Sequence, residues 1–119
     1  MFEHEDIIFY QMNGLMLGTW RRTALHADMN DATRNGSGSY ALAHNVVRRE
    51  DVEPTIKALI AAGGTPKRAA DAPQHGGFGG YVADPDGHPW EIAWNPAWKV
   101  DERGLVTFGV RAQRAHRSS

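Results

Sequence analysis

The most informative absence in this 119-residue chain is cysteine, which excludes disulfide bonds and metal sites built from thiolates. The formal net charge is only -1, so composition gives no electrostatic reason to expect nucleic acid or an anionic membrane as a partner. No apolar run approaches the roughly 20 residues that a membrane-spanning helix needs, and nothing resembles a signal peptide. We therefore expect a single cytoplasmic domain without nucleic-acid or membrane partners.

Familiar local motifs for catalysis are also missing. The sequence contains no His-Glu-x-x-His zinc motif. The run Gly-Gly-Phe-Gly-Gly at residues 76–80 is not a phosphate loop, because a strand rather than a helix is expected after it. Function therefore has to be sought in the arrangement of strands and the few polar residues on them.

The most informative segment that is present is a hairpin at residues 76–96. Asp84-Pro85-Asp86-Gly87 suits a type I turn, with proline preset at its second position and glycine free to take positive φ. Because side chains alternate along a strand, the strand after the turn has two different faces. One face carries Trp90, Ile92 and Trp94, and the other carries Glu91, Ala93 and Asn95. We expect the first face to pack into a core and the second to present one carboxylate to a cavity.

The rest of the chain predicts an α+β fold. We expect strands at 6–12, 15–20, 40–47 and 65–70, helices at 23–28 and 51–62, a loop at 30–39, a further strand at 105–110 and a flexible tail at 111–119. The first two strands are joined by the turn signal Asn13-Gly14. With the final hairpin, residues 40–95 give the order β-α-β-β-β.

These motifs together resemble the glyoxalase/bleomycin-resistance/extradiol-dioxygenase superfamily, also called vicinal oxygen chelate proteins. The Asp-Pro-Asp-Gly turn is followed by a strand bearing Glu91, and the Ala-Trp-Asn-Pro ending is similar to a glyoxalase-like branch. Residues 8–15 resemble the late strand pair of a first module, and residues 42–46 resemble the opening strand of a second. The resemblance covers about residues 6–100.

The resemblance implies two βαβββ modules whose sheets face each other around a cleft. Residues 40–100 match a complete second module, and residues 30–39 would be the linker before it. Residues 6–29 match only the last two strands of the first module, as a β-hairpin remnant. Its opening strand, helix and second strand have no expected counterpart. An incomplete module with an exposed apolar edge predicts a homodimer, possibly with exchanged strands; the alternative is a monomer in which residues 105–110 cover that edge.

The resemblance also bears on metals. In metal-bearing members, ligands come from the first and last strands of each module, and Glu91 matches one such position. Gly18 and Ala41 stand at two others and offer no ligand atom. A divalent ion needs at least three protein ligands, so we expect no cofactor. If a divalent metal does bind, Glu91 is the expected ligand.

Glu91 is therefore the main candidate for chemistry. In an apolar cleft its pKa would be raised, and it could act as a general acid or base; the alternative is a structural carboxylate that accepts hydrogen bonds. Alternation adds Ala93 and Asn95 to the predicted ligand cleft, and the resemblance adds Trp20, Asn45 and Tyr81. We expect the protein to bind a small organic molecule there. The alternatives are a metal-dependent lyase or dioxygenase, and a bleomycin-resistance-like sequestering protein.

Overall fold

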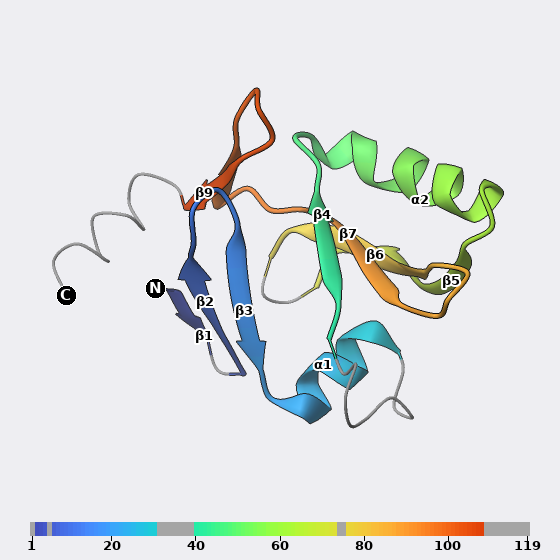
Figure 1. The fold of residues 1–119 in the computed structure, drawn as a ribbon, viewed down its shortest axis with the longest axis horizontal. Coiled ribbons are helices and arrows are strands. Elements are labelled where there is room, and N and C mark those ends of the chain that lie inside the picture. Colours follow the sequence, from blue (N-terminus) through green and yellow to red (C-terminus); the bar gives the residue numbers. More distant parts are fainter. Residues whose placement is uncertain (1, 5, 31–39, 74–75, 109–119) are drawn as a thin grey trace, which may run out of the picture.

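The computed structural model describes residues 2–4, 6–30, 40–73 and 76–108, and it confirms the α+β fold class (Figure 1). The elements in chain order are β1 (Phe2–His4), β2 (Ile7–Gln11), β3 (Met16–Trp20), α1 (Arg22–Met29), β4 (Leu42–Asn45), the short 3₁₀ helix η1 (Arg49–Asp51), α2 (Val52–Ala61), β5 (Thr65–Asp71), β6 (Phe78–Ala83), β7 (Pro89–Trp94), β8 (Trp98–Val100) and β9 (Val106–Phe108). Within these ranges no helix is long and apolar enough to cross a membrane.

The predicted β-α-β-β-β unit forms a four-stranded sheet in the order β4-β7-β6-β5, which we call sheet B. Strand β4 is parallel to β7, and the other neighbours are antiparallel. Helix α2 packs on one face of sheet B and contributes Val52 and Ile56 to a core with Val82 and Ile92. Trp94 packs against this core, as the alternation along β7 predicts.

The turn between β6 and β7 has the predicted chemistry. The carboxylate oxygen Oδ1 of Asp84 accepts hydrogen bonds from the backbone N–H groups of Asp86 and His88, at 3.0 and 2.9 Å. Gly87 adopts a φ of 89° and donates its N–H to the carbonyl of Asp84. Hydrogen bonds to the ionised carboxylate, led by that from His88, hold the pKa of Asp84 below its usual range.

A second sheet, sheet A, consists of β1, β2 and β3 in antiparallel order. The predicted Asn13-Gly14 turn joins β2 to β3, and it is closed by a hydrogen bond from Met12 N–H to the Leu15 carbonyl. The predicted hairpin of β2 and β3 is present, and a further strand, β1, pairs antiparallel with β2 just as β5 pairs with β6. Strand β1 is three residues long and its sequence, Phe-Glu-His, has no alternating apolar pattern to reveal it.

The hairpin of β8 and β9 lies against the β2–β3 turn. Strand β9 falls within the predicted strand at 105–110, whereas β8 was not expected. The Gln11 side-chain amide donates to the Val106 carbonyl at 3.0 Å, and its oxygen accepts from the Phe108 N–H. The rings of Phe9 and Trp98 meet edge to face at 4.7 Å. These contacts are made to β2 of sheet A. Strand β9 forms a separate two-stranded sheet with β8 and does not pair with an edge of sheet A.

Candidate functional site

Glu91 lies on β7 in the middle of sheet B, on the face opposite α2. In the register of the sheet it stands beside Tyr81 of β6 on one side and Ala43 of β4 on the other. Tyr81 is buried, with 1% of its surface exposed, whereas Ala43 is exposed. Glu91 therefore sits at the boundary between a covered part and an open part of this face.

Helix α1 supplies the cover over Tyr81. The Tyr81 hydroxyl donates a hydrogen bond to the Oδ2 atom of Asp28, in the last turn of α1, at 2.6 Å. Just after the helix, the side-chain amide of Asn30 donates to the Lys67 carbonyl on β5 at 3.3 Å. The neighbouring side chains His26 and Met29 are buried. Helices α1 and α2 thus lie on opposite faces of sheet B, as Figure 1 shows.

Arg68 of β5 also lies close to Tyr81. Its register partner is Tyr81, and its guanidinium carbon lies 5.5 Å from the centroid of the Tyr81 ring. One of its terminal nitrogens pairs with Asp71, and its Nε atom is buried without a hydrogen-bond partner among the described residues. We refer to Glu91, Tyr81, Asp28 and Arg68 as the Glu91 cluster.

The surroundings of Glu91 change its acidity. The pKa of Glu91 is raised to about 7, first by burial and then by the charge of the Asp28 carboxylate, while Arg68 acts in the opposite direction. The pKa of Tyr81 is also raised, first by burial and then by the charges of Glu91 and Asp28, so its hydroxyl stays protonated. Among the described residues, none forms a hydrogen bond with the Glu91 carboxyl group. A carboxyl group that is half-protonated near neutral pH, and that no described residue holds by a hydrogen bond, is equipped to exchange protons.

The predicted cleft residues separate into two groups. Asn45 and Ala93 are register partners on the same face as Glu91, together with Tyr81. Asn95 lies beyond the end of β7, and its side-chain oxygen accepts the Ala97 N–H in a turn. Trp20 ends β3 in sheet A, where it pairs with Ile7, and no described contact joins it to Glu91. Membership of the cleft remains a prediction for all of these residues.

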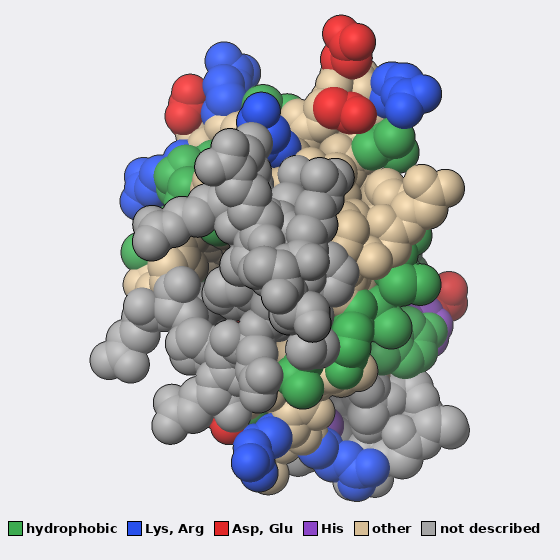
Figure 2. Space-filling view, turned by 90° about the vertical axis from the view of Figure 1, so that its left-hand side faces the viewer, with side chains coloured by type: hydrophobic (Ala, Val, Ile, Leu, Met, Phe, Trp, Pro, Cys, Tyr) green, Lys and Arg blue, Asp and Glu red, His purple; other side chains and the backbone are tan. Residues whose placement is uncertain are grey.

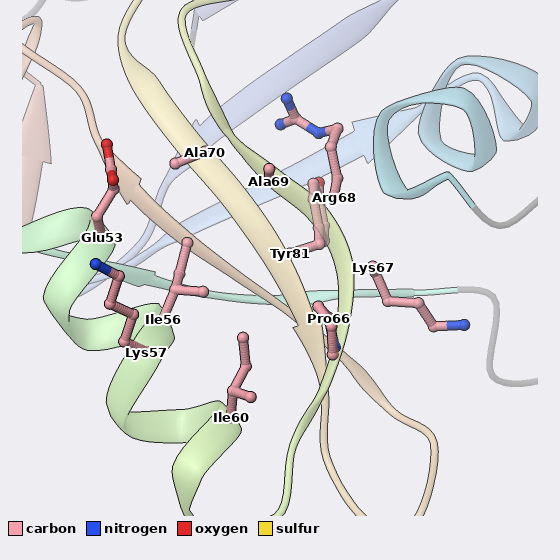
Figure 3. Close-up of a pocket in the computed structure, with 10 residues that line it drawn as sticks. All are labelled: Glu53, Ile56, Lys57, Ile60, Pro66, Lys67, Arg68, Ala69, Ala70 and Tyr81. Carbon is pink, nitrogen blue, oxygen red and sulfur yellow. The ribbon is translucent and has the colours of Figure 1, made fainter.

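A cavity of about 350 Å³ lies between α2 and β5. It is lined by Glu53, Ile56, Lys57, Ile60, Pro66, Lys67, Arg68, Ala69, Ala70 and Tyr81. In Figure 3, Ile56 and Ile60 extend from the helix toward the strand, while Lys67 and Arg68 project away from the helix. The cavity shares Tyr81 and Arg68 with the Glu91 cluster, but Glu91 does not line it. A space of ligand size thus borders the cluster from the side of β5.

Comparison with known proteins identifies the family. A family model described as a glyoxalase-like domain matches residues 10–93, which is most of the chain. The chain belongs to the glyoxalase-like domain family. It is therefore a member of the glyoxalase/bleomycin-resistance/dioxygenase superfamily that its motifs resemble. Among curated proteins, none matches the sequence significantly.

One solved structure supports the same family. A glyoxalase-related enzyme from Fulvimarina pelagi is 53% identical, with a TM-score of 0.59; the match covers 92% of this chain and 78% of that one. A glyoxalase/bleomycin resistance protein/dioxygenase family enzyme from Burkholderia phytofirmans is 18% identical, with a TM-score of 0.48 and coverage of 77% and 73%. A lactoylglutathione lyase from Agrobacterium tumefaciens is 18% identical, with a TM-score of 0.41 and coverage of 75% and 68%. The last two similarities are too low to indicate a shared activity.

The donor set around Glu91 does not fit a divalent metal. Its neighbours in this glyoxalase-like domain are the phenol of Tyr81, the methyl group of Ala43, the cation of Arg68 and a single further carboxylate, that of Asp28, which accepts the Tyr81 hydrogen bond. Nowhere in the described ranges do three His, Asp or Glu side chains converge into a group that could hold an ion. Gly18 pairs with Phe9 in sheet A and brings no ligand to Glu91. The metal content itself remains to be measured.

Two members of the Glu91 cluster were missed by the sequence analysis. Asp28 reaches Tyr81 across 53 residues of sequence, and no local pattern in α1 announces that contact. Arg68 could have been considered as a neighbour of Tyr81, but β5 has register shifts on either side of it. A weak strand with bulges cannot be aligned with its neighbour by counting residues.

Proposed function

We propose that this glyoxalase-like domain binds a small organic molecule on the open face beside Glu91 and exchanges a proton with it through that carboxyl group. The supporting observation is the state of Glu91: its pKa is about 7, and no described residue forms a hydrogen bond with its carboxyl group. A carboxyl group of this acidity can donate a proton when neutral and accept one when ionised.

The neighbours of Glu91 differ in size on its two sides. Tyr81 and α1 cover the β6 side, whereas on the β4 side the neighbour is the small, exposed Ala43, and Ala93 is the next residue on the same face of β7. A ligand lying over these alanines would place a polar group at Glu91 and apolar surface against the methyl groups. Such a site, apolar with a few placed polar groups, is typical of pockets for small molecules.

Binding is tested by titrating a library of small aromatic and amphipathic compounds into the protein, with tryptophan fluorescence and amide NMR shifts as readouts. The proposal expects shifts centred on residues 43, 91 and 93, and affinity reduced at least severalfold in Glu91→Gln. The matched control is Glu53→Gln, because Glu53 lines the α2–β5 cavity and lies on the other side of the sheet. Loss of affinity in Glu53→Gln alone would move the site to the cavity.

The same titration distinguishes the alternative functions. A ligand that binds and is recovered unchanged indicates a sequestering protein of the bleomycin-resistance type. Turnover that survives chelation and is lost in Glu91→Gln supports proton exchange by Glu91. Turnover that requires added metal ion supports a metal-dependent lyase or dioxygenase, with Glu91 as a ligand.

We also propose that the functional unit is a homodimer. Strand β4 is an edge of sheet B, and Leu42 on it is 46% exposed. On sheet A, Leu17 is 49% exposed, and hydrophobic side chains gather at the surface on this side of the molecule in Figure 2. An exposed edge strand with apolar side chains favours pairing with another chain. A second copy of this chain would cover these surfaces, with or without exchange of strands.

A further inference from the structure

The Tyr81 hydroxyl can donate one hydrogen bond, and the charges of two carboxylates, Glu91 and Asp28, both act on it. Glu91 is its direct neighbour across β6 and β7, and side chains of such pairs have Cβ atoms about 4.5–5.5 Å apart. Asp28 approaches from α1 on the same face. The hydroxyl donates to Asp28, at the short distance of 2.6 Å that a charged acceptor favours.

This choice of acceptor determines how Glu91 behaves. A hydrogen bond from a phenol to a carboxylate stabilises the ionised form and makes the group a weaker base. Tyr81 donates its hydrogen bond to Asp28, and Glu91 receives no hydrogen bond from a described residue. With no hydrogen-bond donor to stabilise the ionised form, burial is the largest influence on the pKa of Glu91 and raises it.

We propose that Asp28 is a positioning residue that holds the Tyr81 hydroxyl away from Glu91, so that the Glu91 carboxyl group stays free to exchange a proton. The role of Glu91 in proton exchange rests on the proposed function, whereas the choice of Tyr81 between Asp28 and Glu91 as hydrogen-bond acceptor does not. The consequence is that α1, which follows sheet A in the chain, controls the acid–base group of sheet B.

Other charged groups around Glu91 do not account for this arrangement. Arg68 approaches from β5 over the Tyr81 ring, but its hydrogen bond goes to Asp71 and its charge acts to ionise Glu91. Strand β4 contributes Ala43, which has no charge. Asp28 thus has two effects. It accepts the hydrogen bond from the Tyr81 hydroxyl, and its charge disfavours the ionised form of Glu91.

The test is a carboxyl ¹³C NMR titration of Glu91 in the full chain. Asp28→Asn removes the charge but keeps an oxygen that can accept the Tyr81 proton, so the pKa of Glu91 should fall moderately. Asp28→Ala removes the charge and the acceptor, so Tyr81 should donate to Glu91 and the pKa should fall by about one unit more. With Tyr81→Phe already in place, Asp28→Ala and Asp28→Asn should give the same value.

Two further variants keep the result interpretable. Asp28→Leu fills the space without accepting a hydrogen bond, and it replaces Asp28→Ala if that variant does not fold. Asp51→Ala removes an exposed acid that pairs with Arg48 and should leave the Glu91 titration unchanged. Equal Glu91 pKa values in Asp28→Ala and Asp28→Asn, with Tyr81 intact, would overturn the inference. A wild-type Glu91 that titrates at the ordinary glutamate value of 4.5 would instead overturn the proposed function.

Discussion

Sheets A and B both contain an antiparallel hairpin flanked by a third antiparallel strand, yet they differ in what surrounds that unit. In sheet B the hairpin β6–β7 has α2 on one face and α1 on the other. In sheet A the hairpin β2–β3 ends against β8 and β9, and the described helices α1 and α2 both have contacts on sheet B. The same strand arrangement is thus buried in one half of the molecule and partly exposed in the other.

The difference appears at matching kinds of position. Ile92 on β7 is 1% exposed beneath α2, whereas Leu17 on β3 is 49% exposed. The two positions that match metal-ligand positions of the superfamily differ as well. In sheet B Glu91 pairs with Tyr81, while in sheet A Gly18 pairs with Phe9. A helix on one face and a short covering helix on the other therefore give sheet B both its stability and its unusual carboxyl group.

The largest expected effect compares the two hairpins directly. Ile92→Ala leaves a cavity beneath α2 and should lower the free energy of unfolding by about 2–5 kcal/mol. Leu17→Ala removes a half-exposed side chain and should cost less than about 1 kcal/mol. Urea unfolding followed by circular dichroism measures both. If the two losses are equal, Leu17 is buried in the protein in solution, and the contrast between the sheets disappears.

The second prediction concerns pH. The pKa of Glu91 is raised from 4.5 to about 7 in the folded state, so between these values the folded protein holds a proton that the unfolded chain has lost. The stability that Glu91 contributes is thus fully present below about pH 4.5 and is lost as the pH rises through 7. At about 1.4 kcal/mol for each pH unit, the 2.5 units give a loss of about 3 kcal/mol.

The measurement is the free energy of unfolding at a series of pH values for the wild type and for Glu91→Gln. The neutral amide cannot ionise, so the difference between the two proteins should change in favour of Glu91→Gln as the pH rises. Glu53→Gln, at an exposed position of α2 beside the α2–β5 cavity, is the control and should follow the wild type. Parallel curves for the wild type and Glu91→Gln would contradict a raised pKa.

The sequence allowed much of sheet B to be predicted, and sheet A less well. The alternation along β7 placed Ile92 and Trp94 correctly on the face that packs in the core with α2. Strands β1 and β8 were missed because three residues are too short for a periodic pattern. The neighbours of Glu91 were predicted only along the sheet. The position of Asp28 next to Tyr81 depends on how α1 packs against sheet B, and that packing cannot be derived from a local sequence pattern.

The third prediction asks whether a second chain covers the exposed surfaces. Light scattering coupled to size exclusion should give a two-chain mass at micromolar concentration. Leu42→Lys places a charge on the exposed edge strand β4 and should shift the protein toward a one-chain mass, since a charged edge disfavours strand pairing. Lys57→Glu, at an exposed position near β5 at the other edge of sheet B, is a control for changed surface charge. A folded wild-type protein of one-chain mass would rule out the homodimer.

The smallest expected effect is that of a chelator. Neither Gly18 in sheet A nor Ala41 before β4 offers a side-chain ligand, and the charged groups around Glu91 are one carboxylate, that of Asp28, and the cation of Arg68, which repels a metal ion. We therefore expect elemental analysis after mild purification to find no stoichiometric first-row metal, and EDTA to leave the melting temperature unchanged within about 1 °C. Glu91→Ala serves as the comparison. About one zinc, iron, manganese or nickel ion per chain that disappears in Glu91→Ala would show that sheet A, or a second copy of the chain, completes a site around Glu91.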